Sequence, residues 1–330
     1  MKSKPMWQPR ASLETLRLRA LLMQRVRSFF AAREVLEVET PVLSRAATVD
    51  PQIDSFFSRL PGDSERWLQT SPEFAMKRLL AAGSGPIFQI AKVFRVDESG
   101  RFHNPEFTML EWYRPGFDHH RLIDECEALL AALDGPASCA RLSYREAFAR
   151  EAGIDPFLAS LTELETRCVQ AIGPLPAMPA IEGADADQSA ARDFLLDLLM
   201  SHVVGPQLGQ DRPEFLLDFP ASQAALAKVR RDVEPPVAER FELFWQGIEL
   251  ANGFHELTDA VEQQRRFEAD QAHRASRGQP VPPYDPHLIA ALEHGLPPCA
   301  GVAVGLDRLL MLLLGLSHIG DGLAFDDERA

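Results

Sequence analysis

The sequence predicts an α+β fold in which an antiparallel β-sheet is flanked by helices. Three patterns support this: a long amphipathic segment near the start, two β-favouring runs around a polar loop, and a late strand, glycine turn and helix. Apolar residues every three or four positions indicate helix, whereas alternation or a short apolar run indicates strand. With 46% hydrophobic and 25% charged residues, the 330-residue chain can bury a sizeable core.

The first segment predicts a helix followed by a strand. Ser12 is a preferred N-cap residue, and apolar side chains then recur at intervals of three and four up to Ala32. Apolar and Thr residues alternate with glutamates over residues 36–40, and Pro41 follows. This pattern is typical of a strand that exposes one face and stops at proline.

Two apolar, β-favouring runs, residues 86–95 and 107–113, enclose a polar segment. We expect them to form an antiparallel pair joined by a long loop. Residues 135–215 lack the β-favouring runs of the preceding segment. They combine a helical pattern at 192–202 with a Pro- and Ala-rich stretch at 173–186 that is typical of a loop.

We therefore predict a mainly helical insertion at 135–215 within a discontinuous core formed by residues 12–134 and 216–330. The last third of the chain alternates strand and helix patterns. In order, we expect a strand at 239–250, a turn at Asn252-Gly253, a helix at 258–274, a proline-rich loop at 280–286, a strand at 301–305 and a helix at 306–314.

Charge and composition exclude several classes of protein. The 34 basic and 48 acidic residues give a net charge of −14, which opposes any broad cationic surface for nucleic acid. The longest strongly apolar run, residues 309–316, falls far short of the ~20 residues that a membrane helix needs. Four widely spaced cysteines suit reduced thiols. We expect a cytoplasmic protein without a membrane segment.

The polar loop between the first two β-runs could bind a nucleotide triphosphate. Arg95 could neutralise an α-phosphate, His103 could reach the terminal phosphates, and Phe107 could stack on a base. The alternative is a solvated hairpin tip with a buried Phe.

Two pairs of residues could complete such a site. Glu111 and Tyr113 share one strand face with Phe107, so they could bind an ammonium group, although an internal salt bridge would explain Glu111 as well. Glu249 and Glu256 could hold Mg²⁺ if the Asn-Gly break brings them together; surface exposure is the usual fate of glutamates.

Histidine pairs give no metal motif. His119-His120 lacks a ligand context in the sequence, and His255-Glu256 is followed by Asp259 where a zinc protease needs a second histidine.

Three segments together resemble the signature of the class II aminoacyl-tRNA synthetases: residues 30–41 motif 1, 94–114 motif 2 and 301–315 motif 3. The strings HNPEFTM from His103 and ELANGF from Glu249 are similar to lysyl-tRNA synthetases. The core length, the opening Trp-Gln-Pro and the string EWYRP from Glu111 resemble the elongation factor P (R)-β-lysine ligases, paralogues in which we expect no N-terminal OB-fold domain.

The resemblance implies a reaction and its partners. ATP, with Mg²⁺, would activate (R)-β-lysine or lysine as an acyl-adenylate, and the acyl group would pass to a lysine ε-amine of elongation factor P. It also implies a homodimer with Pro41 at its interface and no anticodon-dependent tRNA binding. The alternatives are a stand-alone lysyl-tRNA synthetase, which acidic charge disfavours, and a non-catalytic paralogue with a regulatory role.

The resemblance also assigns residues. The ATP-binding set implied is Arg95, Val96, Asp97, His103, Asn104, Phe107, Glu249, Leu250, Gly305 and Arg308, of which Arg95 and Arg308 would be catalytic. The substrate-binding set implied is Ser71, Pro72, Glu73, Glu111, Tyr113, Glu256 and Ala303, with Glu249 and Glu256 as metal ligands.

Two positions depart from relatives. Val96-Asp97 stands where they typically have Asn-Glu, so Asp97 could reach adenine through water or leave the contact to Glu98. Ala303 replaces the glycine usual in lysyl-tRNA synthetases, and its methyl group could favour a β-amino acid.

Overall fold

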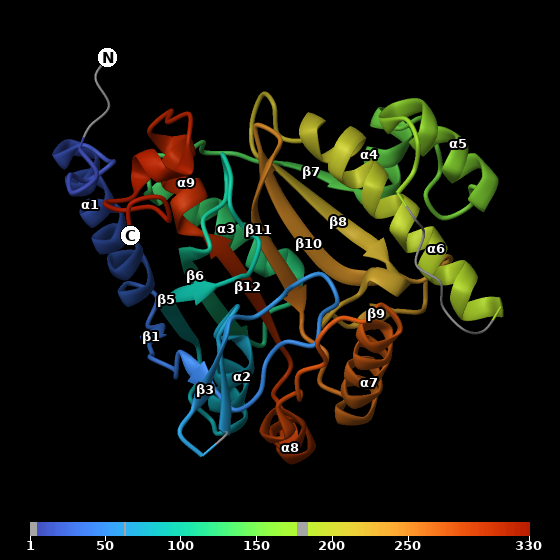
Figure 1. Cartoon of the computed structure of the whole chain (residues 1–330), viewed down its shortest axis with the longest axis horizontal. Helices are drawn as coiled ribbons and strands as arrows, with labels where there is room; N and C mark the ends of the chain where they lie inside the picture. The colour runs from blue at the N-terminus through green and yellow to red at the C-terminus, as the bar shows by residue number, and fades with distance from the viewer. Residues whose placement is uncertain (1–4, 63, 177–183) are drawn as a thin grey trace.

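A computed structural model describes residues 5–62, 64–176 and 184–330 of the chain. Within this part, the fold is built on a nine-stranded sheet with the order β1-β5-β6-β12-β11-β10-β8-β7, and β9 pairs with β10 (Figure 1). Its strands are β1 (Leu36–Glu37), β5 (Ile87–Phe94), β6 (Glu106–Pro115), β7 (Ala140–Ser143), β8 (Glu214–Pro220), β9 (Val229–Arg230), β10 (Val237–Trp245), β11 (Ile248–His255) and β12 (Cys299–Gly305). The β1–β5 and β7–β8 pairs are parallel and the other pairs are antiparallel, which confirms the predicted α+β class.

One face of the sheet is covered by α1 (Leu13–Ala31), α3 (His119–Ala132) and α9 (Leu306–Leu313). Ser12 caps α1 as predicted, its side chain accepting a hydrogen bond from the Thr15 N–H at 3.0 Å. Phe30 of α1 stacks on Phe88 of β5, and Trp112 of β6 lies in the same buried cluster. Burial of these aromatic rings holds the helical layer against the sheet.

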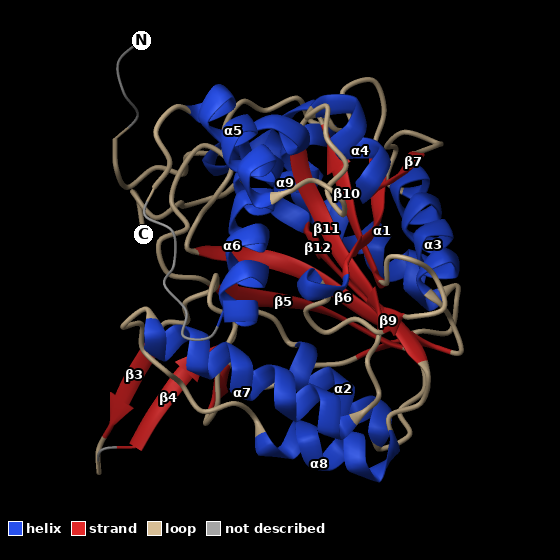
Figure 2. Cartoon of the chain, turned by 90° about the vertical axis from the view of Figure 1, so that its right-hand side faces the viewer, coloured by secondary structure: helices blue, strands red, loops and turns tan. Residues whose placement is uncertain are grey.

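The other face carries two separate helical groups. At one end, α4 (Tyr144–Glu151), α5 (Leu161–Ile172) and α6 (Ala184–Leu199) share a core with β8 and β10. At the other end, α2 (Glu73–Ala81), α7 (Ala260–Ser276) and α8 (Pro286–Gly295) pack on β5, β6 and β12. A small sheet of β2 (Leu43–Ser44), β3 (Phe57–Leu60) and β4 (Ser64–Leu68) projects away from the main sheet, as Figure 2 shows.

The structure corrects several expected element bounds. The strand predicted at 239–250 is a hairpin, because Gln246 and Gly247 both adopt positive φ and turn the chain between β10 and β11. The turn predicted at Asn252-Gly253 lies inside β11. There, a Cβ on Gly253 would stand 2.3 Å from the Phe241 ring, so glycine serves packing at this position. The expected strand at 36–40 is shorter, and α8 was not predicted.

Residues 135–215 contain the expected helices and also β7, which joins the edge of the main sheet. Part of the predicted loop, residues 177–183, lies outside the described residues. The domain division at 135 and 215 stays a prediction. All four cysteines are free thiols. No described helix is long and apolar enough to cross a membrane.

Candidate active site

A cleft of about 1860 Å³ opens between the two helical groups, with the sheet as its floor. Strand alternation decides which residues line it. On β6, Phe107 and Met109 face the cleft, while Leu110 and Trp112 face the core. The cleft has a cationic, aromatic end and a carboxylate-rich end.

Arg95 occupies the cationic end, where the loop after β5 begins. Its guanidinium lies 5.2 Å from the centre of the Phe107 ring and 3.4 Å from a Glu98 oxygen. The buried Nε of Arg95 has no hydrogen-bond partner among the described residues. Burial, together with the Arg308 charge, lowers the pKa of His103 in the same loop. Because the Nε–H of Arg95 has no partner in the described part of the chain, it could donate to an anionic ligand such as phosphate.

Arg308 fastens this loop to the sheet. Its Nε donates to the Phe102 carbonyl at 3.1 Å, and its Nη1 donates to the Glu249 carbonyl at 2.9 Å. Arg308 follows Gly305 at the start of α9, and both residues line the cleft. The position of the Arg308 guanidinium is therefore fixed by two hydrogen bonds to backbone carbonyls.

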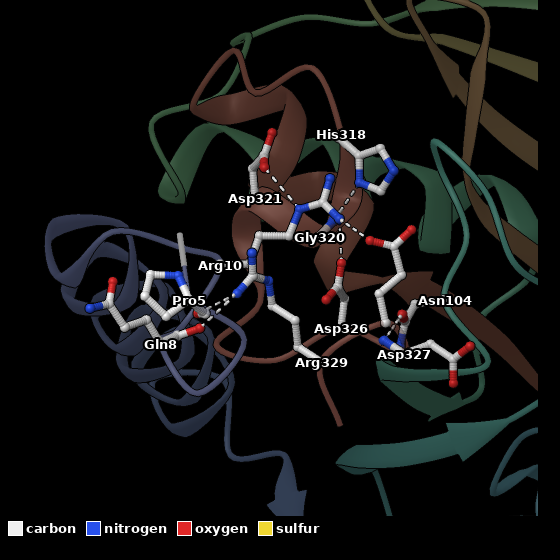
Figure 3. A network of polar contacts seen from close by, with 11 residues as sticks. Pro5, Gln8, Arg10, Asn104, His318, Gly320, Asp321, Asp326, Asp327 and Arg329 are labelled. Atoms are coloured by element: carbon white, nitrogen blue, oxygen red, sulfur yellow. Dashed lines mark hydrogen bonds and ion pairs between the residues drawn. The ribbon is translucent and has the colours of Figure 1, made fainter. Parts of the chain in front are cut away.

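The side-chain amide of Asn104 braces the same loop. Its Nδ2 donates to the Glu106 carbonyl at 2.7 Å, and its Oδ1 accepts from the Asp327 N–H at 3.0 Å. Figure 3 shows this bond beside the Arg10 ion pairs that hold the C-terminal segment. Asn104 also lines the cleft, and the adenine contact expected of it stays a prediction.

The other end of the cleft is built around Glu111, which is 2% exposed. Its two oxygens accept hydrogen bonds from Ser71 Oγ at 2.7 Å and Tyr113 Oη at 2.6 Å. Burial, followed by the charge of Glu73, raises the pKa of Glu111 to about 7. Since no cation of the described residues is in direct contact with Glu111, an ammonium ligand would stabilise its charged form.

Lys77 of α2 links two further carboxylates. Its Nζ lies 2.6 Å from Glu73 and 2.6 Å from Glu256, and the lysine is 1% exposed. Burial alone would lower the pKa of Lys77, but Glu256 and Glu73 outweigh it and raise that pKa. Lys77 thus contacts two of three neighbouring carboxylates, and the third, Glu111, is left to pair with a cationic substrate.

Gly301 of β12 makes room for this cluster. A Cβ at that position would stand 2.2 Å from the Tyr113 ring and 2.5 Å from Glu256 Oε1. In the same strand, Ala303 is directly opposite Glu111 in the β6 register and lines the cleft. Small residues on β12 therefore let the acidic side chains lie flat against the sheet.

A β-bulge determines which glutamates meet. Phe244 pairs with Glu249 and Leu243 with Ala251, so Leu250 is the extra residue. The bulge turns Glu249 to the cleft, where it lies beside Glu242 of β10. Burial raises the pKa of Glu242 to about 7; Arg240 opposes that rise and Glu249 adds to it.

Comparison with known proteins decides the family. The class II tRNA synthetase family (D, K and N) matches residues 6–329. The chain belongs to this family. It is 50% identical to the elongation factor P (R)-β-lysine ligase of Pseudoalteromonas translucida over 331 residues, which cover 98% of this chain and 99% of the relative.

Relatives of the same name occur in Vibrio cholerae, at 50% identity with 98% of both chains covered, and in Salmonella arizonae, at 49% identity with both chains fully covered.

In this class II synthetase-family chain, the structure gathers most of the predicted site. The cleft-lining members are Ser71, Pro72, Glu73, Arg95, His103, Asn104, Phe107, Glu249, Leu250, Ala303, Gly305 and Arg308. Glu111, Tyr113 and Glu256 lie buried in the wall behind Glu73.

Three residues of the expected site lie elsewhere than the sequence analysis predicts. The backbone of Val96 is bonded to Asp54, and neither Val96 nor Asp97 lines the cleft, whereas Glu98 does. Glu256 is paired with Lys77 at the carboxylate-rich end, whereas Glu249 lies beside Arg308 at the other end. Glu242, which the sequence analysis missed, is the glutamate that lies near Glu249 in the cleft. The sequence places Glu242 and Glu249 on either side of the Gln246-Gly247 turn, but it does not reveal the bulge that turns both side chains to the same face.

Proposed function

We propose that this protein activates (R)-β-lysine or lysine with ATP and transfers the acyl group to a lysine ε-amine of elongation factor P. The observation that carries this proposal is one cleft with Arg95, Phe107 and Arg308 at one end and Glu73 at the other, where Glu111 and Glu256 are buried in the wall. One end suits a nucleotide triphosphate and the other suits a substrate with two ammonium groups. The names of the three relatives agree with a β-lysine substrate.

In the first step, the substrate carboxylate attacks the α-phosphorus of ATP, an acyl-phosphate bond forms, and pyrophosphate leaves. Arg95 would offset the charge that develops on the α-phosphoryl oxygens, while Phe107 and Arg308 would hold the purine between them. In the second step, the neutral ε-amine of the acceptor attacks the acyl carbon, an amide forms, and AMP leaves. No enzyme nucleophile is required.

Glu242 and Glu249 are the residues that would hold Mg²⁺. The raised pKa of Glu242 fits this role, because two neighbouring carboxylates at a cleft wall gain from a divalent cation with oxygen ligands. When bound, Mg²⁺ would neutralise phosphate charge.

A homodimer completes the proposal. Apolar residues of α1 and the segment after it are exposed, and β1 is an edge strand of the main sheet. The exposed set is Leu18, Leu21, Leu36, Val42 and Leu43, near Pro41. Because a translation factor is the acceptor, we place the reaction in the cytoplasm.

The test combines the protein with ATP, each lysine isomer, and either elongation factor P or tRNA. A mass gain of one lysyl group on elongation factor P supports the proposal, and charging of tRNA supports the stand-alone synthetase. Arg95→Ala should abolish lysine-dependent pyrophosphate exchange, whereas Arg59→Ala, which changes an exposed arginine of β3, should leave it intact. Exchange that survives in Arg95→Ala contradicts the site.

A further inference from the structure

A second group of ligand-type side chains lies across the sheet from the cleft. It consists of His119 at the start of α3, Glu239 of β10 and His255 at the end of β11. On their strands, Glu239 and His255 alternate with Arg240 and Phe254, which line the cleft. They therefore point to the face that α3 covers. One ligand atom from each of the three lies within 4.8 Å of the others.

His119 is the unusual member of this group. It is 1% exposed, and neither of its ring nitrogens has a hydrogen-bond partner within residues 5–62, 64–176 and 184–330. An unpartnered buried polar group costs about 1–3 kcal/mol, so proteins rarely keep one without a reason. Its ring is nearly parallel to that of His255, with centroids 6.4 Å apart, and His120 lies on another side at 4.0 Å.

The charge states of the group suit a cation. Burial, followed by the neighbouring His120, lowers the pKa of His119 to about 4, so the imidazole is neutral and keeps a lone pair. The hydrogen bond from His255 lowers the pKa of Glu239, which keeps the carboxylate ionised. Asp118 adds a nearby negative charge and Lys228 a positive one.

We propose that His119, Glu239 and His255 bind a divalent transition-metal ion of the zinc type. Two imidazoles and one carboxylate, with an open position for water, are a donor set that zinc uses in proteins. Ligand bonds of about 2.0–2.2 Å place the donor atoms of a tetrahedral site about 3.4 Å apart. The three donor atoms now lie within 4.8 Å of one another, so on binding the wider contacts would shorten and the 2.6 Å contact between Glu239 and His255 would lengthen. In this geometry the ion replaces the proton that Glu239 Oε2 and His255 Nδ1 share at 2.6 Å.

The bound ion would link α3 to the ends of two central strands. His255 directly precedes Glu256, whose carboxylate faces the opposite side of the sheet and contacts Lys77. The ion would therefore fix the strand end behind the amino-acid pocket. The sequence analysis did not predict this site from His119-His120 or from His255-Glu256, because the three ligand residues are far apart in the sequence.

The experiment measures zinc binding directly. The full-length protein is stripped with a chelator and titrated with Zn²⁺ against a chromogenic zinc indicator, with excess Mg²⁺ present to occupy the carboxylates of the cleft. We expect one tightly bound Zn²⁺ per chain. His119→Gln and His255→Gln should each weaken binding by at least about tenfold. His120→Gln is the matched control and should bind as the unchanged protein does.

Circular dichroism of each variant identifies any that fails to fold. If one of His119→Gln and His255→Gln does not fold, the zinc affinity of the other tests the proposal. Cobalt substitution gives a second readout, since Co²⁺ at a tetrahedral site should produce visible absorption that His119→Gln removes. Absence of stoichiometric zinc binding overturns the proposal. Equal binding by His119→Gln, His255→Gln and the control overturns it too.

Discussion

At the scale of single residues, Lys77 is the counter-ion that keeps Glu73 and Glu256 together. Replacing it by methionine leaves two neighbouring carboxylates without a cation, in surroundings where removal of one ion-pair partner costs about 3–5 kcal/mol. We expect Lys77→Met to unfold at a clearly lower temperature. Where it folds, we expect a raised KM for the lysine substrate and little change for ATP.

Lys92→Met is the control for this change, because Lys92 forms an exposed ion pair with Glu106 whose loss should cost at most about 1 kcal/mol. Thermal unfolding and the two KM values are the measurements. A Lys77→Met protein with unchanged stability and unchanged KM would show that the cluster needs no internal cation.

Glu111 makes a second prediction at this scale. Since the folded-state pKa of Glu111 is raised to about 7, the native protein without substrate binds a proton that the unfolded chain has released. This contribution to stability is complete below the unfolded pKa near 4.5 and is lost as pH rises through about 7. An ammonium substrate, which needs the ionised carboxylate, should bind more tightly over the same interval.

We therefore expect the rise in melting temperature caused by (R)-β-lysine to grow from pH 6 to pH 8, roughly across that pKa. Glu111→Gln should remove this growth, and a variant that still shows it would assign the titration to another group.

At the scale of elements, β12 separates the two ends of the cleft. In Gly301→Ala the new methyl group overlaps the Tyr113 ring and Glu256, so we expect loss of lysine binding together with lowered stability. In Gly305→Ala the nearest atoms are 3.8 Å away, so the fold should tolerate the change and ATP binding alone should weaken. The KM values for lysine and for ATP, measured separately, test this. If Gly301→Ala raised only the KM for ATP and Gly305→Ala only that for lysine, the two ends of the cleft would be wrongly assigned.

Elements also show what could be predicted from the sequence. The β5–β6 pair and the β12–α9 unit have local patterns, so their residues and the facing of Phe107, Glu111 and Tyr113 were predictable. The bulge at Leu250 was not, because it depends on pairing with β10, and it decides that Glu249 meets Glu242. Lys77 was missed for a similar reason: its partners Glu73 and Glu256 meet only after α2 packs on the end of β11.

At the scale of the whole molecule, the exposed apolar surface of α1 and the following segment predicts a dimer. Leu36 is 55% exposed and Leu43 is 48% exposed, and Figure 1 shows α1 and β1 along one side of the molecule. Leu36 lies on the edge strand β1 of the main sheet and Leu43 on β2, an edge strand of the small sheet, and exposed apolar side chains on edge strands are a liability unless a partner covers them. We expect the doubly substituted protein Leu36→Lys, Leu43→Lys to be monomeric, because two desolvated ammonium groups would oppose association.

Light scattering coupled to gel filtration measures the mass of each form. Leu158→Lys is the matched control, since Leu158 is 75% exposed and lies in the segment before α5, far from α1 in Figure 1. The unchanged protein and the control should elute at twice the chain mass of 36.7 kDa, and the double variant at the chain mass. A monomeric unchanged protein, or a dimeric double variant, would move the interface away from this surface.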